Sequence, residues 1–112
     1  MNWQEFDGGT SIGQRGSEDG IILRDEELDH GARITMERGG RTAPFAITCG
    51  IYGWMVHTRF FGTDSEAQAE FESMKPELGR ILDTIPLASE ADLESKVPEV
   101  AEALSGFVER FP

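Results

Sequence analysis

Cys49 and His57 are the side chains best suited to nucleophilic catalysis, because a histidine can take the proton from a cysteine thiol. They lie eight residues apart, in two consecutive apolar runs that we expect to form neighbouring strands. An even-length turn between the runs, centred on Tyr52 and Gly53, sets Cys49 across from Val56. In that register Cys49 and His57 point to opposite sides of the sheet. We therefore expect Cys49 to be a buried, unreactive thiol.

A second candidate is a phosphate-binding loop, because Gly8 and Gly13 have the spacing of the two glycines in that motif. The lysine of the motif is replaced by Gln14, and its serine or threonine by Arg15. The segment also lacks a predicted strand before it and a helix after it, which would aim backbone amides at a phosphate. We expect a glycine-rich loop without nucleotide binding.

The third candidate is a metal site in residues 25–30, which hold four carboxylates and His30. These residues lack the alternating acidic spacing of a calcium loop, and the other possible zinc ligands are scattered along the chain. We expect the charges to protect an edge strand from pairing with other sheets, with Arg24 and Arg33 neutralising some of them. The residues therefore predict no catalytic centre, metal ion or cofactor.

The whole chain is short and acidic, with 112 residues and a formal net charge of −11. Residues 63–112 hold 12 of the 21 acidic residues and 4 of the 10 basic ones. Such a balance argues against nucleic acid and anionic membranes as partners, since both attract clustered basic residues. The single cysteine excludes a disulfide-stabilised scaffold, and no signal peptide or membrane span is recognisable. We expect one cytoplasmic domain covering residues 1–112.

The elements that would position these residues change character near Thr63. Residues 1–20 suggest a loop or a short edge strand, and residues 21–61 suggest a β meander. Its clearest strand places Ala32, Ile34 and Met36 on one face. Residues 63–111 have the helical period instead, with a capping box at Thr63. The fold class is therefore α+β, with an antiparallel sheet of four to five strands and two C-terminal amphipathic helices on one face.

Each expected helix has one apolar stripe, the second beginning near Ser89. The apolar positions are Ala67, Phe71, Met74, Leu78, Ile81, Leu82 and Ile85 in the first helix, and Leu93, Val97, Val100, Leu104, Phe107, Val108 and Phe111 in the second. Pro76 and Pro98 fall away from these stripes and should face solvent. Either helix could bend or break at its proline.

The helices leave the opposite side of the sheet, the reverse face, to be covered by something else. The even register places an amphiphilic set there and at the adjoining hairpin tip: Tyr52, Met55, His57, Arg59 and Phe61. Aromatic residues, methionine and arginine are enriched in protein interfaces. Either the N-terminal residues Trp3, Phe6 and Ile12 cover this face, or another chain does.

These observations predict a non-enzymatic protein-interaction module that associates with itself through the open sheet face, as a homodimer. One alternative is a small-ligand binder or modest enzyme with a pocket between the sheet and the helices. Another is an anionic mimic that binds a basic protein partner. Pull-down of a basic partner in low salt, or a metabolite seen in native mass spectrometry, would distinguish the alternatives.

Overall fold

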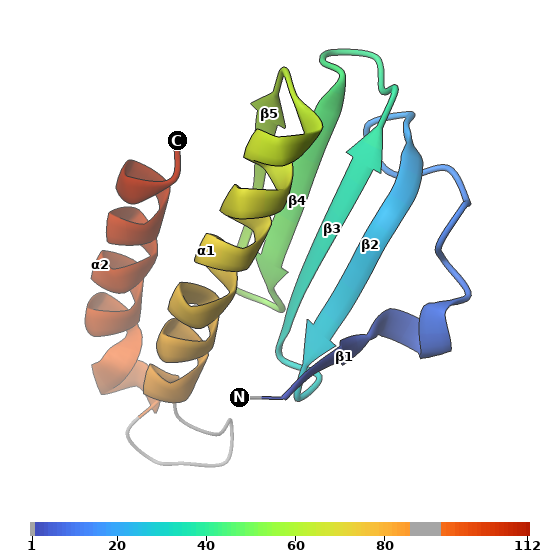
Figure 1. The fold of residues 1–112 in the computed structure, drawn as a ribbon. Coiled ribbons are helices and arrows are strands. Elements are labelled where there is room, and N and C mark those ends of the chain that lie inside the picture. Colours follow the sequence, from blue (N-terminus) through green and yellow to red (C-terminus); the bar gives the residue numbers. More distant parts are fainter. Residues whose placement is uncertain (1, 86–92) are drawn as a thin grey trace.

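A computed structural model describes residues 2–85 and 93–112 and shows a five-stranded antiparallel sheet followed by two helices (Figure 1). The strands lie in sequence order: β1 (Trp3–Glu5), β2 (Ile21–Leu28), β3 (Ala32–Arg38), β4 (Phe45–Ile51) and β5 (Met55–Phe61). The remaining elements are η1 (Phe6–Gly9), which is a 3₁₀ helix, α1 (Asp64–Thr84) and α2 (Leu93–Arg110). The predicted α+β meander is confirmed. The expected helix start near Ser89 falls outside the described residues.

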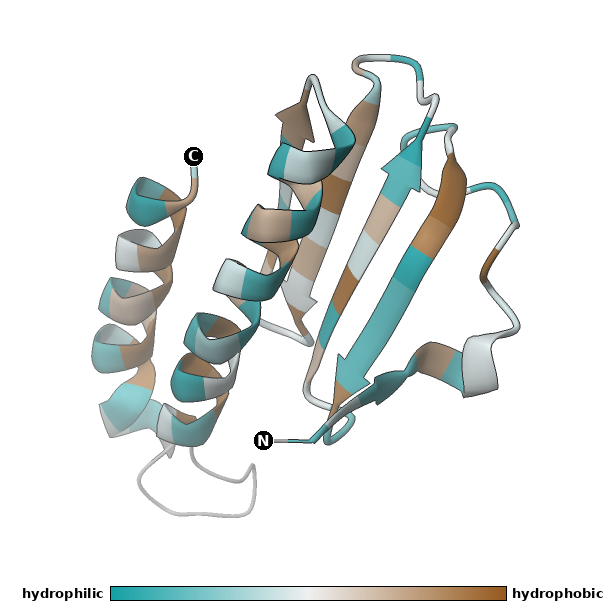
Figure 2. Cartoon of the chain, in the orientation of Figure 1, coloured by the Kyte–Doolittle hydropathy of each residue, from teal (hydrophilic) through white to brown (hydrophobic). Residues whose placement is uncertain are grey.

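The side of the sheet that faces α1, the helix side, carries the hydrophobic core. Ala32, Ile34 and Met36 of β3 are fully buried there, and their polar neighbours point to the reverse face. Figure 2 shows this alternation along β3. Ile47 and Ile51 of β4 lie opposite them and are buried as well. The alternation predicted from the sequence therefore sets the orientation of the central strands.

Helix α1 begins where Thr63 accepts a hydrogen bond from the backbone amide of Glu66, at 3.3 Å. This bond satisfies an amide that has no partner within the helix. The predicted stripe is buried against the sheet at Ala67, Phe71, Met74, Leu78 and Ile81. Pro76 is exposed, as predicted, and the helix continues through it.

Helix α2 packs beside α1 and lies outside the edge formed by β5 (Figure 1). Val100, Phe107 and Phe111 are buried, whereas Val97 and Val108 are 43% and 38% exposed. The buried stripe is therefore narrower than predicted. Pro98 lies on the exposed side, as expected, and the helix runs through it without a break.

The N-terminal residues cover only half of the reverse face. Trp3 pairs with Leu28 and packs on the helix side, which corrects its predicted position. Phe6 does reach the reverse face, where the Arg33 guanidinium lies 3.6 Å from its ring centroid. Ile12 is 40% exposed, so it covers little. This segment, residues 2–20, is called the N-terminal cover below.

No helix in the described ranges is both long enough and apolar enough to cross a membrane.

Candidate interaction surface

The turn between β4 and β5 has the opposite parity to the prediction. Ile51 pairs with Met55, so the turn contains three residues, and Cys49 lies opposite His57. The Trp54 amide donates to the Ile51 carbonyl at 2.9 Å, and Gly53 has a φ of 82°, which favours glycine. A shift of one residue moves every side chain of a strand to the other face. The predicted even register is therefore wrong.

Four of the five residues predicted to form the interface lie on the helix side as a result. These are Met55, His57, Arg59 and Phe61. Arg59 is only 8% exposed and forms an ion pair with Glu70 of α1 at 2.8 Å. Its Nε also donates to the Pro112 carbonyl, at 3.2 Å. These four side chains help to attach the helices to β5 and are not part of an open face.

His57 is held in the same way, because its Nε2 lies 2.6 Å from the carbonyl oxygen of Phe111. Buried polar groups are stable when they are hydrogen-bonded, and here the partners come from the far end of the chain. The local sequence pattern around His57 contains no sign of them. This explains why burial of apolar residues was a poor guide to the register.

Tyr52 is the one predicted interface residue that remains beside the reverse face. Its side chain is 46% exposed at the hairpin tip. Its hydroxyl donates to the Glu27 carboxylate at 2.7 Å. Burial of part of the ring, together with this carboxylate, raises the pKa of Tyr52 to about 12. The phenol therefore stays neutral near physiological pH.

The covered half of the reverse face is organised around Asp25, a fully buried carboxylate of β2. Arg33 donates to its two oxygens from Nε and Nη2, at 2.9 and 2.6 Å. Ser11 of the N-terminal cover donates at 2.8 Å and Thr35 at 3.1 Å. Burial alone would raise the pKa of Asp25, but these hydrogen bonds and the Arg33 charge hold it below its usual value. Asp25 thus fastens the cover to the sheet.

Glu37 is a second buried carboxylate on this half. It accepts hydrogen bonds from the backbone amides of Glu18 and Gly20, with the shortest at 3.0 Å. Gly16 approaches it so closely that a Cβ atom would stand 2.3 Å from the carboxyl carbon. Both acidic groups are thus used to hold the N-terminal cover in place.

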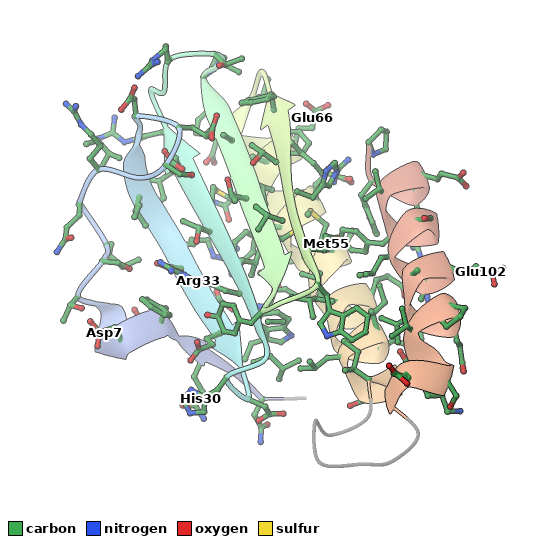
Figure 3. All side chains as sticks on the ribbon, turned by 180° about the vertical axis from the view of Figure 1, so that it is seen from behind. Asp7, His30, Arg33, Met55, Glu66 and Glu102 are labelled. Carbon is green, nitrogen blue, oxygen red and sulfur yellow. The ribbon has the colours of Figure 1, made fainter. Side chains whose placement is uncertain are left out.

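The other half of the reverse face carries no charged side chain and is exposed at Val56 and Phe60. The residues that face this side of the sheet are Ala46, Thr48 and Gly50 of β4 and Val56, Thr58 and Phe60 of β5. Val56 is 79% exposed and Phe60 44%. We call these six residues the open patch. Figure 3 views the molecule from this side.

A basin of about 690 Å³ lies between the N-terminal cover and the hairpin tip. Arg15 and Gly16 border it on one side and Tyr52 on the other, and Thr35 and Thr48 line it. Arg33, Glu37 and Tyr52 already have partners within the chain. Most of the polar groups that line the basin are therefore already hydrogen-bonded within the chain. Few of them are left to bind or react with a ligand.

Cys49 lies across from His57, and its side chain belongs to the core on the helix side. Burial raises the pKa of its thiol to about 12, although the nearby Arg59 charge opposes the shift. The thiolate is the nucleophilic form, so it is scarcely populated near neutral pH. The structure thus juxtaposes the two residues that the predicted register separated, in an environment that suppresses the thiol. Within residues 2–85 and 93–112, no cluster of three His, Cys, Asp or Glu residues suits a metal ion.

We expect native Cys49 to react with a thiol reagent at least about 100-fold more slowly than free cysteine. The reason is that the side chain is 1% exposed and its thiolate is disfavoured. Labelling followed by mass spectrometry, with and without denaturant, measures the ratio. Equal rates in the native and unfolded protein would contradict the burial of Cys49.

The sequence did contain one sign of the true register. Only the odd turn places Thr48 opposite Thr58, and their hydroxyl oxygens lie 3.2 Å apart. Paired threonines are a favourable cross-strand combination. Weighing this pair would have placed Val56 and Phe60, which the prediction missed, on the reverse face.

No protein-family model matches this chain, and neither the curated proteins nor the solved structures contain a significant match.

Proposed function

We propose that this protein is a non-enzymatic interaction module that forms a homodimer through the open patch. The observation that carries the proposal is the exposure of Val56 and Phe60 on an uncharged sheet face of a chain with net charge −11. Exposed apolar side chains on a sheet are commonly buried by association. The patch is also free of the like charges that would oppose contact between two copies.

The shape of the reverse face supports a second copy as the partner. It places the exposed side chains of Val56 and Phe60 at and beside the basin, which Val56, Thr35 and Thr48 line. In a two-fold contact the same surface meets itself, so Val56 and Phe60 of each copy can contact the basin of the other. The surface is complementary to itself in this sense.

The distribution of charge supports the same arrangement. The acidic helix α1 packs on the helix side, away from the open patch, whereas α2 stands outside β5, where Val56 and Glu109 line one groove (Figure 1). Charges separated by more than about 8 Å are largely screened at physiological ionic strength. Dimerisation through the reverse face therefore keeps the α1 helices of the two copies apart.

The alternative functions have weaker support. The space between the sheet and α1 is filled by fully buried side chains such as Ile34, Phe71 and Met74, so a ligand pocket between these two layers has no support. The exposed acidic residues of α2 include Glu94, Glu99 and Glu102. They are compatible with a basic protein partner, but solvated acidic helix faces are common.

We expect Phe60→Glu to weaken the dimer at least about tenfold, because a carboxylate would be placed in an apolar contact. Sedimentation velocity over a range of concentrations measures the monomer–dimer equilibrium. Circular dichroism should be unchanged, since Phe60 is 44% exposed and lies outside the core.

Val97→Glu is the matched control, because Val97 is 43% exposed and lies on α2, away from the open patch. It adds the same charge and should leave the equilibrium unchanged. A wild-type chain that remains monomeric at high concentration would refute the homodimer. Equal weakening by both substitutions would attribute the effect to net charge and count against the patch.

A further inference from the structure

The outer edge of β5 has no backbone partner within the described residues. β5 is the last strand of the sheet, and the backbone hydrogen bonds outside the regular elements involve none of residues 55–61. The opposite edge is partly closed, because β1 pairs with the end of β2 and Gly13 and Gln14 bond to Ile22. An unpaired edge presents a row of donors and acceptors that another strand can use.

β5 lacks several of the devices that prevent such pairing, although Arg59 points inward and α2 lies beside it. It has seven residues, its register against β4 is regular, and it contains no proline and no carboxylate. Its one full charge, Arg59, is turned inward to Glu70. Protected edges are typically short, bulged, interrupted by proline or guarded by charge. The edge is therefore competent to accept a strand.

A groove of about 570 Å³ lies between the beginning of β5 and α2. Trp54, Met55 and Val56 line it from the sheet, and Leu104 and Val108 from the helix. Figure 3 shows α2 standing outside β5, so a chain placed along β5 would have the helix beside it.

A second copy of the protein does not fit this edge. Two-fold pairing of β5 with β5 would place α2 of one copy over β4 and β5 of the other, because α2 projects beyond the edge (Figure 3). That side of β4 is already covered by α1. The outer edge of β5 thus accommodates a single extended segment. The homodimer proposed above uses the open patch on the reverse face instead.

The charge around the groove indicates which segments fit. Glu109 lines it, and Glu102 is exposed on the same helix. Toward the helix, alternate side chains of an added strand would contact Leu104 and Val108, which are apolar. We infer that β5 and α2 bind an extended segment of another protein by strand addition, with an apolar centre and basic ends.

The test uses a synthetic peptide in which valine and threonine alternate between lysine-rich ends. Amide shifts of the isotope-labelled protein should change along β5 and at Leu104 and Val108 of α2. A peptide N-methylated at alternate residues should bind roughly tenfold more weakly, because it cannot complete the hydrogen-bond ladder. Glutamates in place of the lysines should also weaken binding, and added salt should reduce this difference.

Two protein variants separate the groove from general charge effects. Val108→Glu should weaken binding roughly tenfold, and Val97→Glu on the same helix should leave it unchanged. Val108 and Val97 are 38% and 43% exposed, so neither change should unfold the protein, and thermal melting checks this. Absence of shifts at millimolar peptide would overturn the inference. So would binding that is insensitive to N-methylation, or shifts confined to the open patch, since those would report contact with the face.

The result is independent of the homodimer. If the protein forms the dimer but does not bind the peptide, strand addition is refuted and the homodimer proposal is unaffected. A monomeric protein that binds the peptide along β5 would support strand addition and refute the dimer.

Discussion

Asp25→Asn is expected to lower the free energy of unfolding by about 3 kcal/mol, the usual cost of breaking a buried ion pair. The Asp25 carboxylate is fully buried and accepts hydrogen bonds from Arg33, Ser11 and Thr35. An amide cannot match all of these donors and leaves the Arg33 charge without its counterion. Urea denaturation measures the loss. Trypsin should also cut faster after Arg15, because Ser11 no longer ties the N-terminal cover to β2.

The effect should depend on pH in a defined direction. The pKa of Asp25 is lower in the folded protein than its ordinary value near 3.8. Its contribution is therefore present above that value and is lost as the pH falls through the folded-state pKa. The difference between wild type and Asp25→Asn should shrink below about pH 4.

Asp29→Asn is the matched control for this change. Asp29 is exposed in the turn between β2 and β3, with a φ of 49° that asparagine also tolerates. The same chemical change there should alter stability by less than about 0.5 kcal/mol. Similar losses at both positions would contradict the role assigned to Asp25.

Phe71→Ala is expected to cost about 4 kcal/mol, because it removes a large side chain from the centre of the core. Phe71 lies on the buried face of α1, and the Arg24 guanidinium lies 4.1 Å from its ring centroid. Domains of this kind have about 5–15 kcal/mol of total stability, so the variant should be close to unfolding at physiological temperature. Thermal and urea denaturation would measure the loss.

Phe60→Ala provides the comparison, since the same atoms are removed from a side chain that is 44% exposed. It should cost the monomer less than about 1 kcal/mol. A loss below about 1 kcal/mol for Phe71→Ala would contradict the packing of α1 on the sheet.

The parts of the fold that were predictable depend on contacts close in sequence. The change of period at Thr63 and the alternation of Ala32, Ile34 and Met36 each reflect one buried face. Such a face is visible in the pattern of a single segment. The order of the strands followed because short turns favour antiparallel pairing of consecutive strands.

The candidate surface was not predictable in the same way. His57 and Arg59 are polar residues on the helix side, and Val56 and Phe60 are apolar residues on the reverse face. Ranking the two registers by hydrophobicity therefore selects the wrong one. The groups that make the true register stable, including the Phe111 carbonyl, are brought in by tertiary folding from more than 50 residues away.

The N-terminal cover illustrates the same limit. Residues 2–20 contain few apolar side chains, so no periodicity identifies their place. They are held by Ser11 donating to Asp25 and by the stacking of Arg33 on Phe6. Polar and cation–π contacts of this kind carry little periodic signal in a sequence.

The strictly sequential strand order has a consequence for how the chain folds during synthesis. All five strands precede α1, so the complete sheet leaves the ribosome before the helix that covers it. At the usual rate of about 5–20 residues per second, the 21 residues of α1 take roughly 1–4 s to make. Hairpins form in about 1–10 µs, so the sheet has ample time to assemble with Ile34, Met36 and Ile47 in contact with water. Completion of α1 is thus the step that ends the period in which the nascent chain is most prone to aggregate.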